Sequence, residues 1–276
     1  MAGRFFDFGR NWEDFATKAL DPARVAQARD DFRELLGDIT LVGKSFLDIG
    51  FGQGLSLLIA AESGARVVGC DINPLCAEAL SKTSRFFPNF DSTRVPVVIG
   101  SILTEATVVT LRTRPEASAD GYDVVHSWGV LHHTGDMAAA LRQASSLVGP
   151  GGYLILAIYN RHWTSLPWKA IKWSYCRSPH WLHRLLVTLL YPIIWLAKLM
   201  VTAHSPAKQS RGMDFYYNVV DWVGGYPYEY ASIGELVGLV EALGYRCEKC
   251  LPAQVPTGCN QFIFRQIGRP AGSAGG

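Results

Sequence analysis

The stretch LDIGFGQG, residues 47–54, joins a short apolar run to a helical pattern and has glycine at positions 50, 52 and 54. Glycine lacks a Cβ atom, so three glycines at a strand-to-helix turn let backbone N–H groups and a helix N-terminus approach a ligand closely. Asp48 stands two residues before the first glycine, and Leu55 stands where a dinucleotide fingerprint would place its last glycine. The stretch therefore predicts either a ligand-binding loop of another spacing or only a tight turn.

Around this loop, short apolar runs alternate with helical patterns. Five runs have the length and composition of strands, and several are nearly continuous in apolar residues, as strands buried on both faces of a sheet are. Two further strand candidates follow near the end of the chain. The seven runs cover residues 45–50, 66–71, 96–101, 122–127, 152–159, 246–250 and 261–267. This alternation predicts an α/β fold with a doubly wound, mostly parallel sheet.

Polar or small residues follow the second and third strand candidates, at the edge where parallel strands end. Asp71 comes 21 residues after Gly50, where a carboxylate can accept both hydroxyls of a ribose, although it could instead cap the helix that starts near Pro74. Ser101 and Ile102 follow the third strand, where an adenine ring could be bracketed. Together these positions predict a nucleoside site along one edge of the sheet.

With these features, the sequence resembles the class I S-adenosylmethionine-dependent methyltransferases that act on small molecules. The resemblance covers about residues 40–160 and 232–267. It rests on LDIGFGQG, VVGCDINP, the GS pair after the third strand, YDVVHSWGVLHHTGD and LVGPGGYLILAIYN. It implies a Rossmann-like sheet of seven strands with the last one antiparallel, and S-adenosylmethionine as the cofactor.

The resemblance also implies a set of cofactor-binding residues. In that family the glycine loop carries the methionine part, the acid after the second strand holds the ribose, and the segment after the third strand borders the adenine. The residues implied are Asp48, Gly50, Phe51, Gly52, Gly54, Asp71, Ile72, Ser101 and Ile102, with Trp128 as a wall of the pocket. The family often has an aspartate where Ser101 stands, so this sequence departs from the pattern at the adenine.

The segment HSWGVLHHTGD after the fourth strand lies where the transferred methyl group would emerge. Methyl transfer is an in-line displacement, so the protein must place the acceptor and exclude water, and a hydroxyl acceptor also benefits from a general base. His132, His133 and Tyr159 are the catalytic candidates, because they lie at this edge. The two histidines could instead be an element of the fold, and Tyr159 a surface residue. His126, inside the strand, is expected to be structural.

Residues 161–230 differ in kind from the rest of the chain. They hold six of the eight Trp and seven of the eleven Tyr, with eight Lys and Arg against three Asp and Glu, and there is no acid between Met137 and Met213. A helical pattern spans residues 181–200, but its uninterrupted apolar run is too short for a membrane span. Two interpretations stay open: an aromatic, helical cap after the fifth strand that builds the acceptor pocket, or an element that contacts anionic membrane lipids.

The predicted organisation is a core interrupted by this cap and flanked by two ends. An arm and helix occupy residues 1–39, the cofactor-binding core residues 40–160 and 231–267, the cap residues 161–230, and a disordered tail residues 268–276. The arm could fold over the cofactor as a lid or only pack outside, through Phe5, Phe8, Arg10 and Trp12. The loop at residues 213–230, rich in Tyr and Gly, is expected to line the acceptor side.

Composition limits the partners and the setting. A net charge of +2 argues against a nucleic-acid partner, and the scattered cysteines with no apolar leader in MAGRFFDFGRNW favour a cytoplasmic protein, with membrane contact through residues 181–200 left open. No metal site is expected, because Cys247 and Cys250 would point to opposite faces of a strand and, with Cys259, lack a fourth ligand. The sequence leaves the oligomeric state open.

The predicted activity is methyl transfer to a small, apolar or aromatic acceptor through an oxygen, sulfur or carbon atom. A methyltransferase for proteins or nucleic acids is the alternative enzyme. It is disfavoured because residues 127–130, SWGV, lack the Asp/Asn-Pro-Pro-aromatic motif typical of enzymes that methylate exocyclic amino groups. A regulator that binds the cofactor without catalysis is the alternative from another class.

Overall fold

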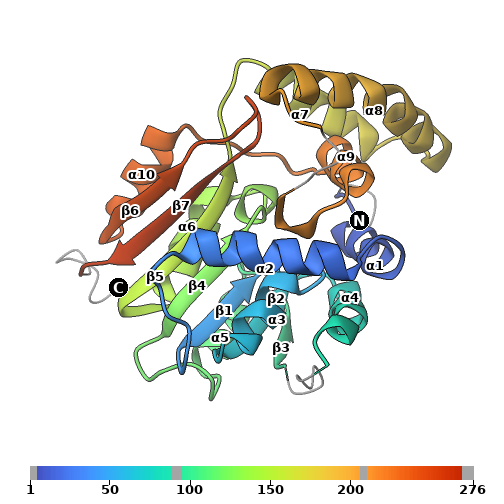
Figure 1. The fold of residues 1–276 in the computed structure, drawn as a ribbon. Helices are drawn as coiled ribbons and strands as arrows, with labels where there is room; N and C mark the ends of the chain where they lie inside the picture. The colour runs from blue at the N-terminus through green and yellow to red at the C-terminus, as the bar shows by residue number, and fades with distance from the viewer. Residues whose placement is uncertain (1–4, 89–94, 206–209, 269–276) are drawn as a thin grey trace.

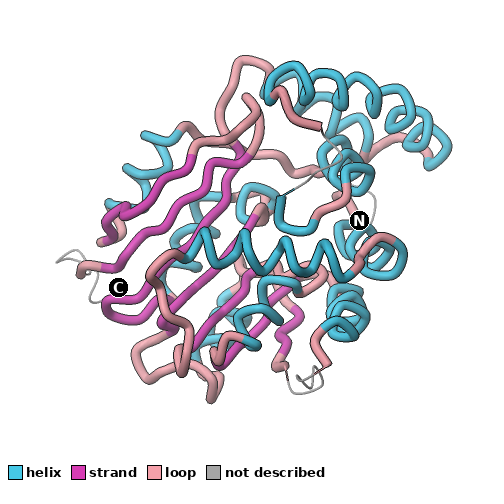
Figure 2. The backbone as a smooth tube through the Cα atoms, in the orientation of Figure 1, coloured by secondary structure: helices cyan, strands magenta, loops and turns pink. Residues whose placement is uncertain are grey.

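The computed structural model describes residues 5–88, 95–205 and 210–268, and a seven-stranded sheet forms its centre (Figures 1 and 2). The strands are β1 Ser45–Ile49, β2 Arg66–Asp71, β3 Val97–Ile99, β4 Tyr122–Trp128, β5 Val148–Tyr159, β6 Tyr245–Leu251 and β7 Cys259–Gln266. They lie in the order β3-β2-β1-β4-β5-β7-β6, and β7 is antiparallel to both of its neighbours while the other pairs are parallel. The predicted doubly wound, mostly parallel sheet is confirmed.

Helices cover both faces of this sheet. One face packs against α2 (Pro22–Leu36), α3 (Leu55–Glu62) and α4 (Leu75–Thr83), and the other against α5 (Glu105–Arg112), α6 (Met137–Ser146) and α10 (Ile233–Glu241). Successive residues of a strand point to opposite faces, so Phe46 joins the first core and Leu47 the second. This burial on both sides explains why the strand sequences are apolar without alternation.

Three elements differ from the predictions. The expected arm contains a helix, α1 (Phe8–Lys18), which begins where Asp7 accepts the backbone N–H of Arg10. A second helix, α9 (Phe215–Gly224), occupies the expected loop, because Asp214 caps it through the N–H of Tyr216. The fifth strand begins at Val148, earlier than expected, because Val148 pairs with Tyr122 of β4. The strand therefore includes the glycine-rich stretch that follows Val148.

The chain between β5 and α10 forms a separate group of helices on one side of the molecule (Figure 1). It contains α7 (Ser165–Tyr175), α8 (His180–Thr202), the short turn η4 (Ser210–Gly212) and α9. The chain leaves the sheet and returns to it at the same place. There the N–H of Ala231 donates to the carbonyl of Tyr159 at 3.0 Å, and the N–H of Arg161 donates to the carbonyl of Ala231 at 3.1 Å. The helix predicted for residues 181–200 is confirmed as α8, and the predicted tail lies outside the described residues from position 269 onward.

Candidate active site

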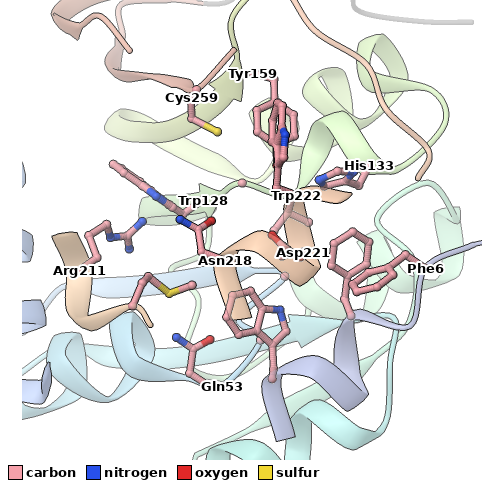
Figure 3. Close-up of a pocket in the computed structure, with 18 of the residues that line it drawn as sticks. Phe6, Gln53, Trp128, His133, Tyr159, Arg211, Asn218, Asp221, Trp222 and Cys259 are labelled. Carbon is pink, nitrogen blue, oxygen red and sulfur yellow. The ribbon is translucent and has the colours of Figure 1, made fainter. Parts of the chain in front are cut away.

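A cavity of about 790 Å³ lies at the carboxyl edge of the sheet (Figure 3). The parallel strands β1 to β5 end there, and the direction of strand succession reverses between β1 and β4, which is where open α/β sheets bind ligands. The glycine loop forms one wall, the N-terminal arm a second, and the helices after β5 a third. In the close-up, Arg211 and Trp128 lie on one side and His133 and Phe6 on the other, with Asp221 between them.

The glycine loop adopts a backbone that only glycine tolerates easily. Gly50, Gly52 and Gly54 have φ values of 73°, 54° and 79°, in the left-handed region. A Cβ atom on Gly50 would lie 2.4 Å from both Cγ atoms of Val130. The turn directs the first residues of α3 toward the cavity, so the partial positive charge of a helix N-terminus faces it. The loop is therefore shaped for a close ligand and is more than a tight turn.

Replacing Gly50 by alanine is expected to lower the free energy of unfolding by about 2–5 kcal/mol. About 1–2 kcal/mol comes from the left-handed backbone and a further 1–3 kcal/mol from the contact with Val130. Urea titration measures the loss. Gly151→Ala is the matched control, because Gly151 has φ 70° but open space around it. Equal losses in the two variants would contradict the tight packing at Gly50.

Asp71 anchors the loop from the next strand. Its carboxylate accepts the backbone N–H of Gly52 at 3.2 Å and that of Asn73 at 2.9 Å, and burial raises the pKa of the carboxyl. The side-chain oxygen of Asn73, and not Asp71, accepts the N–H of Leu75 at the start of α4. Asp71 is therefore not the helix cap. The other expected residues at this edge, Ile72, Ser101 and Ile102, also line the cavity.

Asp48 and Trp128 form the floor next to the loop. Asp48 is bonded to the Nδ1 of His126 at 2.7 Å, and both side chains are buried, so His126 is structural as expected. The ring of Trp128 stacks on that of His126 and also carries Arg211, whose guanidinium carbon lies 3.7 Å from the centre of the indole ring. A buried hydrogen bond between Asp48 and His126 thus supports the wall that the sequence assigned to the cofactor.

Arg211 was not singled out in the sequence, where it is one of eight basic residues in residues 161–230. It has a left-handed φ of 60°, held by a hydrogen bond from its N–H to Asp31, and its guanidinium donates to the Oγ of Ser56 at 2.7 Å. Burial lowers the pKa of its side chain to about 10, so it stays charged at neutral pH. A cation from the inserted helices therefore reaches the first turn of α3.

The three catalytic candidates occupy different places. His133 lines the cavity, and its Nδ1 donates to the carbonyl of Pro227 at 2.5 Å, which leaves Nε2 as an acceptor with no partner among the described residues. Burial, together with the charge of Lys172, lowers the pKa of His133 to about 3. Tyr159 also lines the cavity, and burial raises its pKa. His132 is fully buried behind them and does not reach the cavity wall.

A buried lysine and an aspartate lie in the wall formed by α7 and α9. Asp221 lines the cavity, and its Oδ1 has no hydrogen-bond partner within the described part of the chain. Lys172 is fully buried, and its ammonium donates to the carbonyl of Trp222 and lies 4.2 Å and 4.8 Å from the ring centres of Trp222 and Tyr228. Burial raises the pKa of Asp221, and the lysine opposes that shift. Burial lowers the pKa of Lys172, and the aromatic faces around its ammonium oppose that shift.

The arm and the inserted helices close over the cavity. Phe6, Phe8 and Trp12 line it, and the ring centre of Phe8 lies 4.8 Å from that of His133. The backbone N–H of Phe6 donates to the carbonyl of Tyr226 at 3.1 Å. The structure therefore favours the lid over outside packing, although Arg10 does not reach the cavity. Residues of α8 and α9 line the opposite wall, as the cap interpretation requires.

The three cysteines nearest the end of the sequence lie on two strands. Cys247 and Cys250 lie on β6, while Cys259 lies at the start of β7 on the cavity wall. Residues 5–88, 95–205 and 210–268 contain no group of three His, Cys, Asp or Glu side chains that could hold a metal ion.

The fold and this cavity define a Rossmann-like methyltransferase. Residues 22–190 match the family model described as methyltransferase domain, so the chain belongs to this family of class I S-adenosylmethionine-dependent methyltransferases. S-adenosylmethionine is accordingly its cofactor.

Two curated relatives are named ubiquinone biosynthesis O-methyltransferase. The protein from Methylobacterium sp. (strain 4-46) is 30% identical over 57% of this chain and 62% of its own length. The protein from Sodalis glossinidius (strain morsitans) is 30% identical over 44% of each chain. The matched part thus spans about half of these relatives.

Solved structures share the fold at low sequence identity. Magnesium protoporphyrin IX methyltransferase from Synechocystis PCC 6803, with bound SAH, is 15% identical over 88% of this chain and 83% of that one, with a TM-score of 0.51. An O-methyltransferase family protein from Burkholderia thailandensis is 14% identical over 89% and 57% of the two chains, with a TM-score of 0.52.

The residues present fit the cofactor. The glycine loop leaves room where a Cβ atom would protrude, and a buried carboxylate, Asp71, ends the neighbouring strand. Arg211 adds a positive charge at the end of the cavity near α3. A nucleoside with a charged amino-acid group can use all three features.

Proposed function

We propose that this chain methylates a hydroxyl oxygen of a small aromatic acceptor. One observation carries the proposal: two buried polar atoms, His133 Nε2 and Asp221 Oδ1, have no hydrogen-bond partner among the residues that the structure describes, and both residues line an aromatic-walled cavity beside the glycine loop. An acceptor with hydroxyl groups on a flat ring would satisfy both atoms and bury its apolar faces. The O-methyltransferase names of the relatives support oxygen as the accepting atom.

We assign the cofactor along the sheet edge. When bound, S-adenosylmethionine supplies an electrophilic methyl group on a sulfonium sulfur. The carboxylate of Asp71 accepts the ribose hydroxyls, and the side chains at this end of the cavity border the adenine. The glycine loop and Arg211 hold the amino-acid group of the cofactor. Trp128 is the wall of the pocket between the adenosine end and the amino-acid end. The assigned residues that line the cavity are Asp48, Gly50, Phe51, Gly52, Asp71, Ile72, Ser101, Ile102, Trp128 and Arg211. Gly54, which the sequence also predicted, does not line the cavity, and its left-handed φ of 79° shapes the turn before α3.

Arg211→Gln is expected to weaken S-adenosylmethionine binding by roughly 10–100-fold, because the charged hydrogen bond from Arg211 to the carboxylate of the cofactor's amino-acid group is lost. Calorimetry with methylthioadenosine is the control, since that ligand keeps the adenosine but lacks the amino-acid group. Its affinity should not change. An equal loss for both ligands would show that the arginine acts on the fold of the cavity and not on the carboxylate.

The two unpartnered groups have different strengths as bases. A general base works best when its pKa is near the working pH, and burial moves the pKa of Asp221 toward that range. His133, with a pKa of about 3, stays neutral and holds little affinity for a proton. Asp221 would therefore take the proton from the O–H bond of the acceptor, while the new O–C bond to the methyl group would replace the methyl–sulfur bond and leave a neutral thioether. His133 accepts a hydrogen bond that orients the acceptor.

Lys172 influences the pKa of the proposed base, Asp221. Its ammonium favours the carboxylate form of Asp221, so Lys172→Met is expected to raise the pKa of Asp221 further. Activity needs the carboxylate, so the acidic limb of the pH–rate profile of kcat/KM should move to higher pH. Lys169→Met, on the exposed side of the same helix, is the control and should leave the limb in place. An unmoved limb in Lys172→Met, in a folded variant, would exclude this coupling.

A methyl-transfer screen with carbon-13-labelled cofactor tests the proposed function. The acceptors are phenols and catechols, aromatic thiols, and quinols with a free ring carbon, and NMR of the product identifies the atom that carries the methyl group. The proposal predicts product on oxygen. Transfer only to sulfur or carbon would overturn it, and cofactor binding without any transfer would favour the non-catalytic regulator.

A further inference from the structure

An apolar stripe runs along the outside of α8. We define the α8 stripe as Trp181, Leu185, Leu189, Ile193, Leu196 and Met200, which are between 45% and 72% exposed. They recur every three or four residues, so they share one face of the helix. Only Val187 of the 23 residues of α8 is buried. Leu166 and Trp173 of the neighbouring α7 are exposed as well. Such a continuous apolar face marks an interaction surface.

The other side of α8 is fixed to the protein. Val187, Leu190 and Ile194 pack in one cluster with Phe215 and Val219 of α9. Among the described residues, α8 is the one helix that is long and apolar enough to cross a membrane. If α8 crossed a membrane, it would separate from this cluster. If α8 lay flat on the membrane surface, the cluster would stay intact. The packing thus favours a helix that lies in the plane of an interface.

The charges around the α8 stripe indicate which kind of partner it binds. Residues 138–212 contain no acid, and the exposed cations of α7, α8 and the turn between them include Lys169, Arg177 and Arg184. Arg184 lies on the exposed side of α8 itself, three residues after Trp181. A stripe of large apolar side chains with basic neighbours is complementary to a bilayer that contains anionic lipids. A second copy of this chain would bring like charges together.

We propose that the α8 stripe binds the surface of an anionic lipid bilayer, with α8 lying in the plane of the headgroups. The next face of the same helix lines the cavity, through Ile194, Ala197, Lys198 and Val201. Docking would therefore bring the acceptor side of the cavity next to the lipid. The proposal rests on the surface of α7 and α8 alone and holds whichever atom is methylated.

Co-sedimentation with vesicles tests this proposal on the full chain. We expect binding to equal mixtures of phosphatidylglycerol and phosphatidylcholine, and binding that is much weaker to phosphatidylcholine alone and falls with added salt. The variant Leu185→Gln/Leu189→Gln/Ile193→Gln should lose roughly tenfold or more in partitioning. These side chains do not line the cavity, so turnover of a water-soluble acceptor should be kept.

The matched control is Val42→Gln/Val109→Gln/Leu239→Gln, which removes three exposed apolar side chains elsewhere. It should bind vesicles like the unmodified chain. Equal loss in the two triple variants, or no binding by the unmodified chain, would overturn the proposal. Resistance to an alkaline carbonate wash would also overturn it, in favour of a spanning helix. A lipid-free dimer that the stripe variant dissociates, without vesicle binding, would assign the stripe to a second copy.

Discussion

Replacing Asp221 by asparagine is expected to lower kcat/KM for a hydroxyl acceptor by about 10³-fold, within the range for loss of a general base. The amide keeps the size of the side chain but cannot take up the proton. Cofactor affinity should stay the same, because Asp221 lies on α9 and not on the cofactor edge. Steady-state kinetics and calorimetry on the same preparation measure the two quantities.

Glu229→Gln is the matched control for this variant. Glu229 is another acid of residues 161–230 and does not line the cavity, and it accepts the N–H of Met137 at 3.0 Å through an oxygen that glutamine also has. We expect less than a threefold change in kcat/KM. An Asp221→Asn variant that turns over normally while folded would remove Asp221 from the chemistry and return the role of base to His133.

Replacing Asp71 by alanine is expected to weaken S-adenosylmethionine binding by about 100-fold, or about 3 kcal/mol. The carboxylate is proposed to accept the ribose hydroxyls, and it already holds the N–H of Gly52 in the glycine loop. Both effects act in the same direction. Titration calorimetry gives the affinity, and thermal unfolding without ligand shows how much of the loss comes from the loop.

Methylthioadenosine separates Asp71 from Arg211 in this experiment. The ligand keeps the ribose, so Asp71→Ala should weaken it as much as it weakens S-adenosylmethionine, whereas Arg211→Gln should not weaken it. Unchanged affinity of Asp71→Ala for both ligands would contradict the assignment of the cofactor to the ends of β1 and β2.

The cofactor half of the site was predictable because it depends on local order along the chain. Parallel strands bring their carboxyl ends to one edge, so Gly50, Asp71 and Ser101 had to meet once the alternation of strands and helices was recognised. The three glycines of the loop also indicate in the sequence that its backbone has positive φ angles, as the structure shows. No contact between distant segments was needed for this prediction.

The acceptor half was not predictable in the same way, because it depends on packing between distant segments. Asp221 and Lys172 are 49 positions apart and come together only through the contact of α7 with α9. Arg211 reaches the first turn of α3 from 155 positions away. His132 and His133 are adjacent in sequence, yet one is buried behind the wall and the other lines it. Sequence spacing alone does not separate the two.

A crystal structure with S-adenosylhomocysteine and a phenolic acceptor would test the central claim most directly. The account predicts the adenosine between Asp71 and Ser101, and the acceptor ring against the aromatic wall with its hydroxyl about 3 Å from the carboxylate of Asp221. An acceptor hydroxyl outside hydrogen-bond reach of both Asp221 and His133, or an acceptor bound away from the inserted helices, would contradict it.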